Sequence, residues 1–147
     1  MKLAARSHEH LENFLREFYQ DSTLRLPAVY FYTGTLVRLV THALNVSAIT
    51  FGQHVLISPE LVNADSHGRQ SVPGWLVAHE AVHVLQYKRE GYIRFLMHYL
   101  FGYWRALRES GKWDRAARLR AYLAIAEERE AQEVERAYQA KSTGPKH

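Results

Sequence analysis

Hydrophobic positions recur with helical spacing in five segments of the chain. Leu11, Phe14, Leu15 and Phe18 lie three or four residues apart, which predicts an amphipathic helix over about residues 7–20. The same kind of spacing predicts four more helices, over residues 36–44, 75–90, 92–108 and 114–140. Because apolar residues cover most sides of the segment 75–90, we expect it to be the buried central helix.

Strand-like segments lie between the first helices. Residues 28–32 are rich in aromatic and β-branched side chains, which favour a strand. Residues 46–58 contain two short apolar runs separated by Gly52-Gln53, a pattern typical of a hairpin, and the polar residues 63–73 predict a loop. The sequence therefore predicts an α+β fold, mostly helical, with a small antiparallel sheet or hairpin packed on the central helix.

The composition is that of a globular protein without disulfides. The chain has 147 residues and is 47% hydrophobic, which is enough apolar content to exclude a disordered chain. It contains no cysteine, so any metal site must use His, Asp and Glu. We expect a single domain over residues 1–140 and a flexible tail over 141–147. With no pattern of a signal peptide or transmembrane segment, we expect a cytoplasmic protein.

The predicted central helix contains an HExxH motif, His79-Glu80-Ala81-Val82-His83. Residues i and i+4 lie one turn apart on the same helix face, so both imidazoles can bind a single Zn²⁺ ion. A zinc ion with three protein ligands lowers the pKa of the water in its fourth position to about 7. Glu80 is rotated by about 100° from His79, so it would stand beside the metal as the general base and acid.

The third ligand must come from elsewhere in the chain. The extension HExxHxxGxxH is absent, because Gln86 and Arg89 occupy its Gly and His positions. The remaining source is a carboxylate of the helix predicted over residues 114–140. Its candidates are Glu127, Glu128, Glu130, Glu133 and Glu135. Glu128 continues the apolar stripe, while three others form a row of their own that suits a solvated face. The spacing alone leaves this choice open.

The motif and its surroundings resemble a family of zinc enzymes. HExxH with a downstream E-x-x-A is similar to the gluzincin metallopeptidases. AITFGQHVLIS, a polar loop and WLVAHEAVHVLQ resemble the metallopeptidase-like domain associated with extracellular contractile injection systems. This resemblance implies Glu128 as the third ligand, with Ala131 as the small residue. Many gluzincins have an Asp four residues after that Glu. Here Gln132 stands there, and its carbonyl oxygen could accept an N–H from His79 or His83.

Four further features have both a functional and a structural interpretation. Gln86 could contact a ligand or substrate, or lie on the helix surface. Tyr122 and Tyr138 are candidates for stabilising an oxyanion, without a basis for choosing between them. In the family, the hairpin strand before the motif helix offers an edge to an extended substrate, which here would be residues 53–58. The apolar segment 92–104 is expected to pack against the central helix, with a cleft wall, a dimer contact or an interfacial membrane helix as alternatives.

Taken together, these patterns predict a zinc-dependent hydrolase, best described as a metallopeptidase. His79, His83 and Glu128 would bind the metal, Glu80 would be catalytic, and the substrate would be a peptide or protein. One alternative is a zinc-binding structural or interaction module with little or no peptidase activity. Another is a metal-free helical adaptor. The net charge of +4 is modest, and an acidic run follows the basic residues 105–120, so no nucleic-acid partner is expected.

Overall fold

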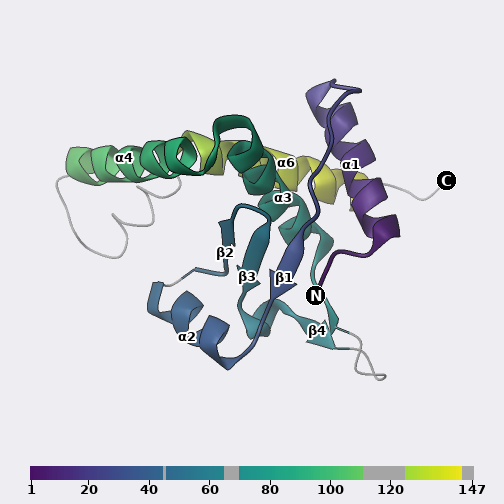
Figure 1. The fold of residues 1–147 in the computed structure, drawn as a ribbon, viewed down its shortest axis with the longest axis horizontal. Helices are drawn as coiled ribbons and strands as arrows, with labels where there is room; N and C mark the ends of the chain where they lie inside the picture. The colour runs from purple at the N-terminus through teal and green to yellow at the C-terminus, as the bar shows by residue number, and fades with distance from the viewer. Residues whose placement is uncertain (45, 65–69, 111–124, 144–147) are drawn as a thin grey trace.

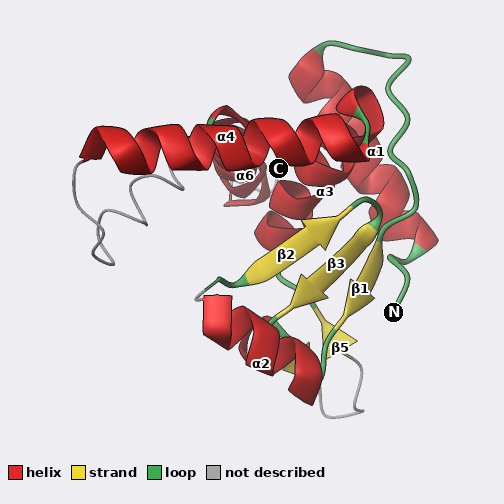
Figure 2. Cartoon of the chain, turned by 60° about the vertical axis from the view of Figure 1, so that its left-hand side comes forward, coloured by secondary structure: helices red, strands yellow, loops and turns green. Residues whose placement is uncertain are grey.

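The structure, a computed structural model, is an α+β fold dominated by helices (Figures 1 and 2). It describes residues 1–44, 46–64, 70–110 and 125–143. The helices are α1 (Ala5–Tyr19), α2 (Thr35–Leu44), α3 (Gly74–Glu90), α4 (Tyr92–Ser110) and α6 (Ala126–Thr143), with a 3₁₀ turn η1 (Pro59–Leu61). The strands are β1 (Tyr30–Tyr32), β2 (Ala48–Phe51), β3 (His54–Ile57), β4 (Asn63–Ala64) and β5 (Gln70–Ser71). The predicted fold class is confirmed.

Helix α3 is the centre of the fold, as its apolar pattern predicts. It packs along α6 and also contacts β2, so most of its sides are covered (Figure 1). Leu76, Ala78 and Val82 are almost fully buried in the core that α3 shares with α1, β1, β3 and α6. The helix ends at Gly91, whose φ of 79° is a conformation that residues with a side chain rarely adopt.

The three-stranded sheet is mixed, so the expectation of an antiparallel sheet is only partly right. The strand order is β1-β3-β2. The short turn at Gly52-Gln53 makes β2 and β3 antiparallel, with Phe51 opposite His54. Strand β1 pairs with β3 in parallel, with Tyr30 opposite His54, because β2 runs antiparallel to both strands and returns the chain before β3 begins. Figure 2 shows β3 between its two neighbours.

This strand order corrects one functional expectation. Residues 53–58 contain β3, and β3 is paired on both sides, so it has no free edge for a substrate. The edge strand beside α3 is β2. The hairpin was predicted from local sequence, but the pairing of β1 with its second strand joins residues more than twenty positions apart, which no local pattern reveals.

The helix boundaries differ from the predictions by a few residues where they can be compared. Helix α1 begins at Ala5 and α2 at Thr35, close to the predicted starts. Within the predicted loop, β4 and β5 form a short antiparallel pair. Residues 111–124 lie outside the described residues, and with them the predicted helix start at Asp114. The last helix continues to Thr143, three residues beyond its predicted end.

Helix α4 departs most clearly from expectation. Of its large apolar residues, Phe95 is buried at 4% exposure and its ring lies 4.1 Å from that of Tyr87. Most of the others remain exposed, because the helix extends away from the body of the molecule (Figure 1). The prediction that this segment packs against the central helix is therefore wrong for most of its length. None of the described helices is long and apolar enough to cross a membrane.

The core of α1 provides a test of this packing. Leu15 is 0% exposed, whereas Leu39 on α2 is 66% exposed. We expect Leu15→Ala to lower the free energy of unfolding by about 2–5 kcal/mol, because it leaves a cavity in the core. The matched Leu39→Ala should change it by less than about 0.5 kcal/mol. Urea denaturation followed by circular dichroism measures both values, and similar losses would contradict this description of the core.

Candidate metal centre

Three potential metal ligands from two helices meet in the interior. Helix α3 supplies His79 and His83, one turn apart, and α6 supplies Glu128. The His79 Nε2 atom lies 3.5 Å from Glu128 Oε2, and the His83 Nε2 atom lies 3.4 Å from Glu128 Oε1. One ligand atom from each residue lies within 4.8 Å of the other two. The structure thus brings together the set expected from the sequence and the family resemblance.

The outer nitrogen of each imidazole has its own partner. The Nδ1 atom of His79 lies 3.1 Å from Glu135 Oε2, and the Nδ1 atom of His83 lies 2.8 Å from Gln86 Oε1. The amide of Gln86 donates from Nε2 to the Glu127 carbonyl at 3.0 Å and to Glu130 Oε2 at 2.7 Å. Those two acceptors fix the amide orientation, so Gln86 Oε1 accepts the Nδ1–H of His83. The Nε2 lone pair of His83 then points toward Glu128.

Gln86 is itself held by a polar network that reaches α1. The Glu130 carboxylate also accepts hydrogen bonds from the Tyr19 hydroxyl at 2.8 Å and from Arg89 Nη2 at 2.9 Å. Burial raises the pKa of Glu130, but the hydrogen bonds from Gln86, Tyr19 and Arg89 lower it by more, so the net shift is downward. Burial and the bond to Glu130 raise the pKa of Tyr19. The carboxylate stays ionised and the phenol stays protonated, which keeps the network intact near neutral pH.

The electrostatics of the triad favour a cation. Burial lowers the pKa of His79, but the hydrogen bond to Glu128 and the charges of Glu80, Glu128 and Glu135 raise it by more. The net upward shift means that a positive charge at this imidazole is stabilised by its surroundings. A metal ion competes with the proton for the same nitrogen atom. Two imidazole nitrogens with a carboxylate oxygen form a donor set that Zn²⁺ accepts, so the residues fit the metal.

Glu80 lies next to this triad and is held from the sheet. Its side chain is buried, at 4% exposure. The Thr50 hydroxyl on β2 donates a hydrogen bond of 2.5 Å to Glu80 Oε2. Strand β2 therefore fixes one oxygen of the carboxylate that the motif predicts as the general base.

The other acidic residues of α6 have different surroundings. Glu128 is 2% exposed, whereas Glu127 and Glu130 are half-buried and Glu133 is exposed. Gln132 was expected to accept a hydrogen bond from His79 or His83. Among the described residues, Glu135 instead lies against His79, at Nδ1. Because residues seven apart share a helix face, Glu135 could have been found from its spacing to Glu128.

Two other expectations were tested only in part. Tyr138 packs its ring edge-on against Phe14 of α1, with the ring centres 5.0 Å apart. Tyr122 lies outside the described residues. Gln86 is 0% exposed and hydrogen-bonded to His83, so the alternative that it lies on the helix surface is wrong. The role of Thr50 was missed, because nothing in its local sequence distinguishes it from an ordinary strand residue.

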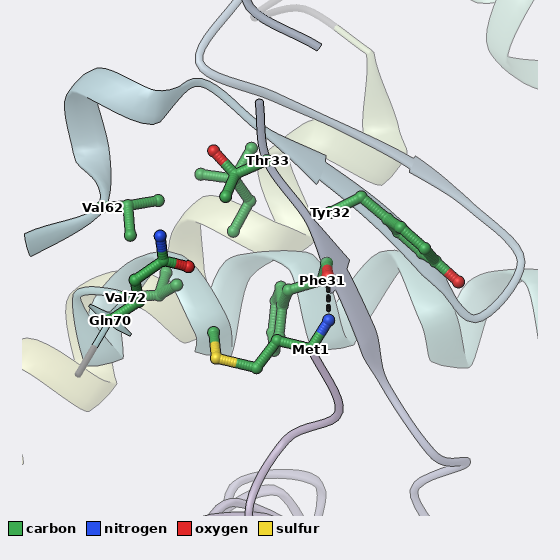
Figure 3. A pocket seen from close by; sticks show the side chains of 8 residues that line it. Met1, Phe31, Tyr32, Thr33, Val62, Gln70 and Val72 are labelled. Carbon is green, nitrogen blue, oxygen red and sulfur yellow. Dashed lines mark hydrogen bonds between the residues drawn. The ribbon is translucent and has the colours of Figure 1, made fainter. Parts of the chain in front are cut away.

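The pocket drawn in Figure 3 is separate from the candidate centre. It has a volume of about 220 Å³ and contains no metal-ligating cluster. The amino terminus donates a hydrogen bond of 2.6 Å to the Phe31 carbonyl beside it. The pocket is lined by Met1, Phe31, Tyr32, Thr33, Ile57, Val62, Gln70 and Val72.

A second group of possible ligands lies on the surface. Glu90, His98 and Glu127 also place one ligand atom each within 4.8 Å of the others. His98 Nδ1 lies 3.1 Å from Glu90 Oε2, and the His98 side chain is 52% exposed. An exposed pair of this kind contributes at most about 1 kcal/mol and needs no metal to explain it.

Comparison with known proteins identifies the family. The chain matches the model of the eCIS core domain over residues 9–91, more than half of its length. It therefore belongs to the eCIS core domain family, where eCIS stands for extracellular contractile injection system. No curated protein and no solved structure matches the chain. The matched region includes HExxH and ends before Glu128.

The Gln86 network can be tested without metal. We expect Gln86→Leu to lower the free energy of unfolding of the metal-free protein by about 1–3 kcal/mol, because His83 and Glu130 lose a buried partner. The matched Gln53→Leu, at an exposed turn position, should have little effect. Urea denaturation in the presence of a chelator measures both variants. Equal stability of Gln86→Leu and the parent protein would show that the bond to His83 does not form.

Proposed function

We propose that this domain is a zinc-dependent hydrolase, and specifically a metallopeptidase. The observation that carries the proposal is the convergence of two imidazole Nε2 atoms and the Glu128 carboxylate beside a buried glutamate. His79, His83 and Glu128 would hold the zinc ion. When bound, zinc lowers the pKa of water to about 7 and polarises a carbonyl group.

The chain's own residues supply the proton transfers. Glu80 accepts the proton of the attacking water and returns it to the leaving amine. Thr50 binds Glu80 Oε2, which leaves the other carboxylate oxygen to carry the proton. Glu135 and Gln86 keep the Nδ1 atoms protonated, so that both imidazoles present Nε2 to the metal.

The position of β2 supports a peptide as the substrate. This strand forms an edge of the sheet and carries Thr50, the residue bonded to Glu80. An extended peptide that pairs with a sheet edge gains main-chain hydrogen bonds regardless of its sequence. Such pairing along β2 would bring a peptide carbonyl close to the general base.

A second candidate function is supported by the low solvent exposure of the three side chains of the candidate centre. The exposed fractions of the His79, His83 and Glu128 side chains are 12%, 8% and 2%. A site this enclosed also suits a structural zinc ion that joins α3 to α6 and performs no catalysis. Measured activity, compared with measured zinc content, separates the two functions.

Substitution of the general base tests catalysis. We expect Glu80→Gln to lower the rate of peptide hydrolysis by at least ~10²–10⁴-fold, because the amide cannot accept the proton. Zinc content, measured by elemental analysis, should stay unchanged. The matched Glu133→Gln, at an exposed position of α6, should keep the parent rate. A parent protein that binds zinc without hydrolysing unfolded proteins or peptide libraries would favour the structural role.

Substitution of the third ligand tests the metal site. We expect Glu128→Ala to weaken zinc affinity by more than the ~10–100-fold typical of residues that only orient a ligand. Glu127→Ala changes the neighbouring carboxylate, which lies outside the triad, and should retain zinc. Competition with a chromophoric chelator measures both affinities. If Glu128→Ala and the parent bind zinc equally, the ligand assignment is wrong.

A further inference from the structure

Helix α4 presents a large apolar surface to solvent. The exposed fractions of its seven apolar residues range from 42% to 82%. We call this set the α4 apolar face: Tyr92, Ile93, Leu96, Met97, Leu100, Phe101 and Trp104. Contiguous apolar patches above a few hundred Å² are rare on soluble monomers unless they bind a partner.

Three groups of side chains lie on different sides of α4: the α4 apolar face, the residues that face the body, and a group of arginines. At 100° per residue, the α4 apolar face covers an arc of about 180°. Phe95 and Gly102 lie on one side of that arc and face the body, where Gly102 approaches Ile125. Arg94 and Arg105 lie just beyond the other edge of that arc and Arg108 lies just within it, so the three fall within about 60° of one another, and all three are exposed. Residues 92–108 contain no acidic side chain.

The apolar surface continues onto the β2–β3 hairpin. Phe51 is 57% exposed, and its ring centre lies 5.5 Å from that of Tyr92. The Tyr92 ring also covers Gly52, where a Cβ atom would come within 2.4 Å of the hydroxyl oxygen. The first turn of α4 is thus fixed to the sheet, and Figure 2 shows α4 running across the molecule above β2. The exposed face thus begins at a turn that packs against the sheet.

We propose that the α4 apolar face docks onto a membrane surface rich in anionic lipids. A broad apolar arc with aromatic residues and a bordering strip of arginines is the pattern of a helix that lies in the plane of the interface. The apolar side chains enter the acyl boundary while the arginines contact anionic headgroups. A second copy of the chain offers the same arginines and no carboxylate within residues 92–108, so this stretch supplies no charge opposite to that of Arg94 and Arg108.

Vesicle binding by the full chain tests the proposal. The probes are phosphatidylcholine vesicles with and without phosphatidylserine, separated from free protein by sedimentation. We expect binding to the anionic vesicles, weakened about five-fold by each of Arg94→Gln and Arg108→Gln. The double variant Ile93→Glu/Phe101→Glu should abolish binding. Its matched control is Leu39→Glu, on the equally exposed Leu39 of α2, and this variant should bind like the parent.

Two results would overturn the proposal. One is the absence of binding to anionic vesicles, or binding that Ile93→Glu/Phe101→Glu leaves intact. The other is a dimer of the parent protein, detected by light scattering, that becomes a monomer in the variant Ile93→Glu/Phe101→Glu. In that case a second copy of the chain covers the α4 apolar face. All the substituted positions are exposed, and circular dichroism verifies that each variant is folded.

Discussion

The pairing of α3 with α6 is the contact on which the rest of the molecule depends. It brings the Glu128 carboxylate, at 2% exposure, against the Nε2 atoms of His79 and His83. Removing a carboxylate from water is costly unless it is compensated by opposite charge and hydrogen bonds. Ala131 and Val134, fully buried on the same face of α6, supply apolar contact that helps to offset this cost. The packing of the core and the chemistry of the site are therefore properties of one interface.

The polar groups around the triad divide into two sets, one in which the charges balance and one with an excess of negative charge. Behind His83, the charge of Glu130 is balanced by Arg89, and Gln86 is bonded to Glu130. Around the His79 imidazole, the neighbouring charges are those of Glu80, Glu128 and Glu135, and they raise the pKa of His79 against the effect of burial. The outer set therefore makes a rigid support, while the inner set keeps an excess of negative charge. This excess is the physical basis for expecting a dication there.

How much of the structure could be predicted from the sequence depends on how far apart in the chain the interacting residues lie. The helices predicted over residues 7–20, 36–44, 75–90 and 92–108, the hairpin, and the pairing of His79 with His83 depend on neighbours within a few residues, and the structure agrees with them. The helix predicted over residues 114–140 begins at Ala126 among the described residues, after a bend at Ile125. The choice of Glu128 needed the family resemblance, because its spacing left several glutamates open. The parallel pairing of β1, the bond from Thr50 to Glu80 and the support from Glu135 depend on residues far apart in the chain. Apolar periodicity alone also could not separate a buried helix from one that exposes its apolar face.

The family match covers only part of the candidate centre. Residues 9–91 contain both histidines and Glu80, but Glu128 comes from α6, beyond the match. The matched segment therefore contains two members of the candidate triad, and the third lies on α6, outside that segment. Helix α4 follows α3 directly, and its Phe95 ring lies 6.3 Å from the ring of His83. One end of α4 therefore packs beside a member of the candidate triad, while most of its apolar side chains are exposed.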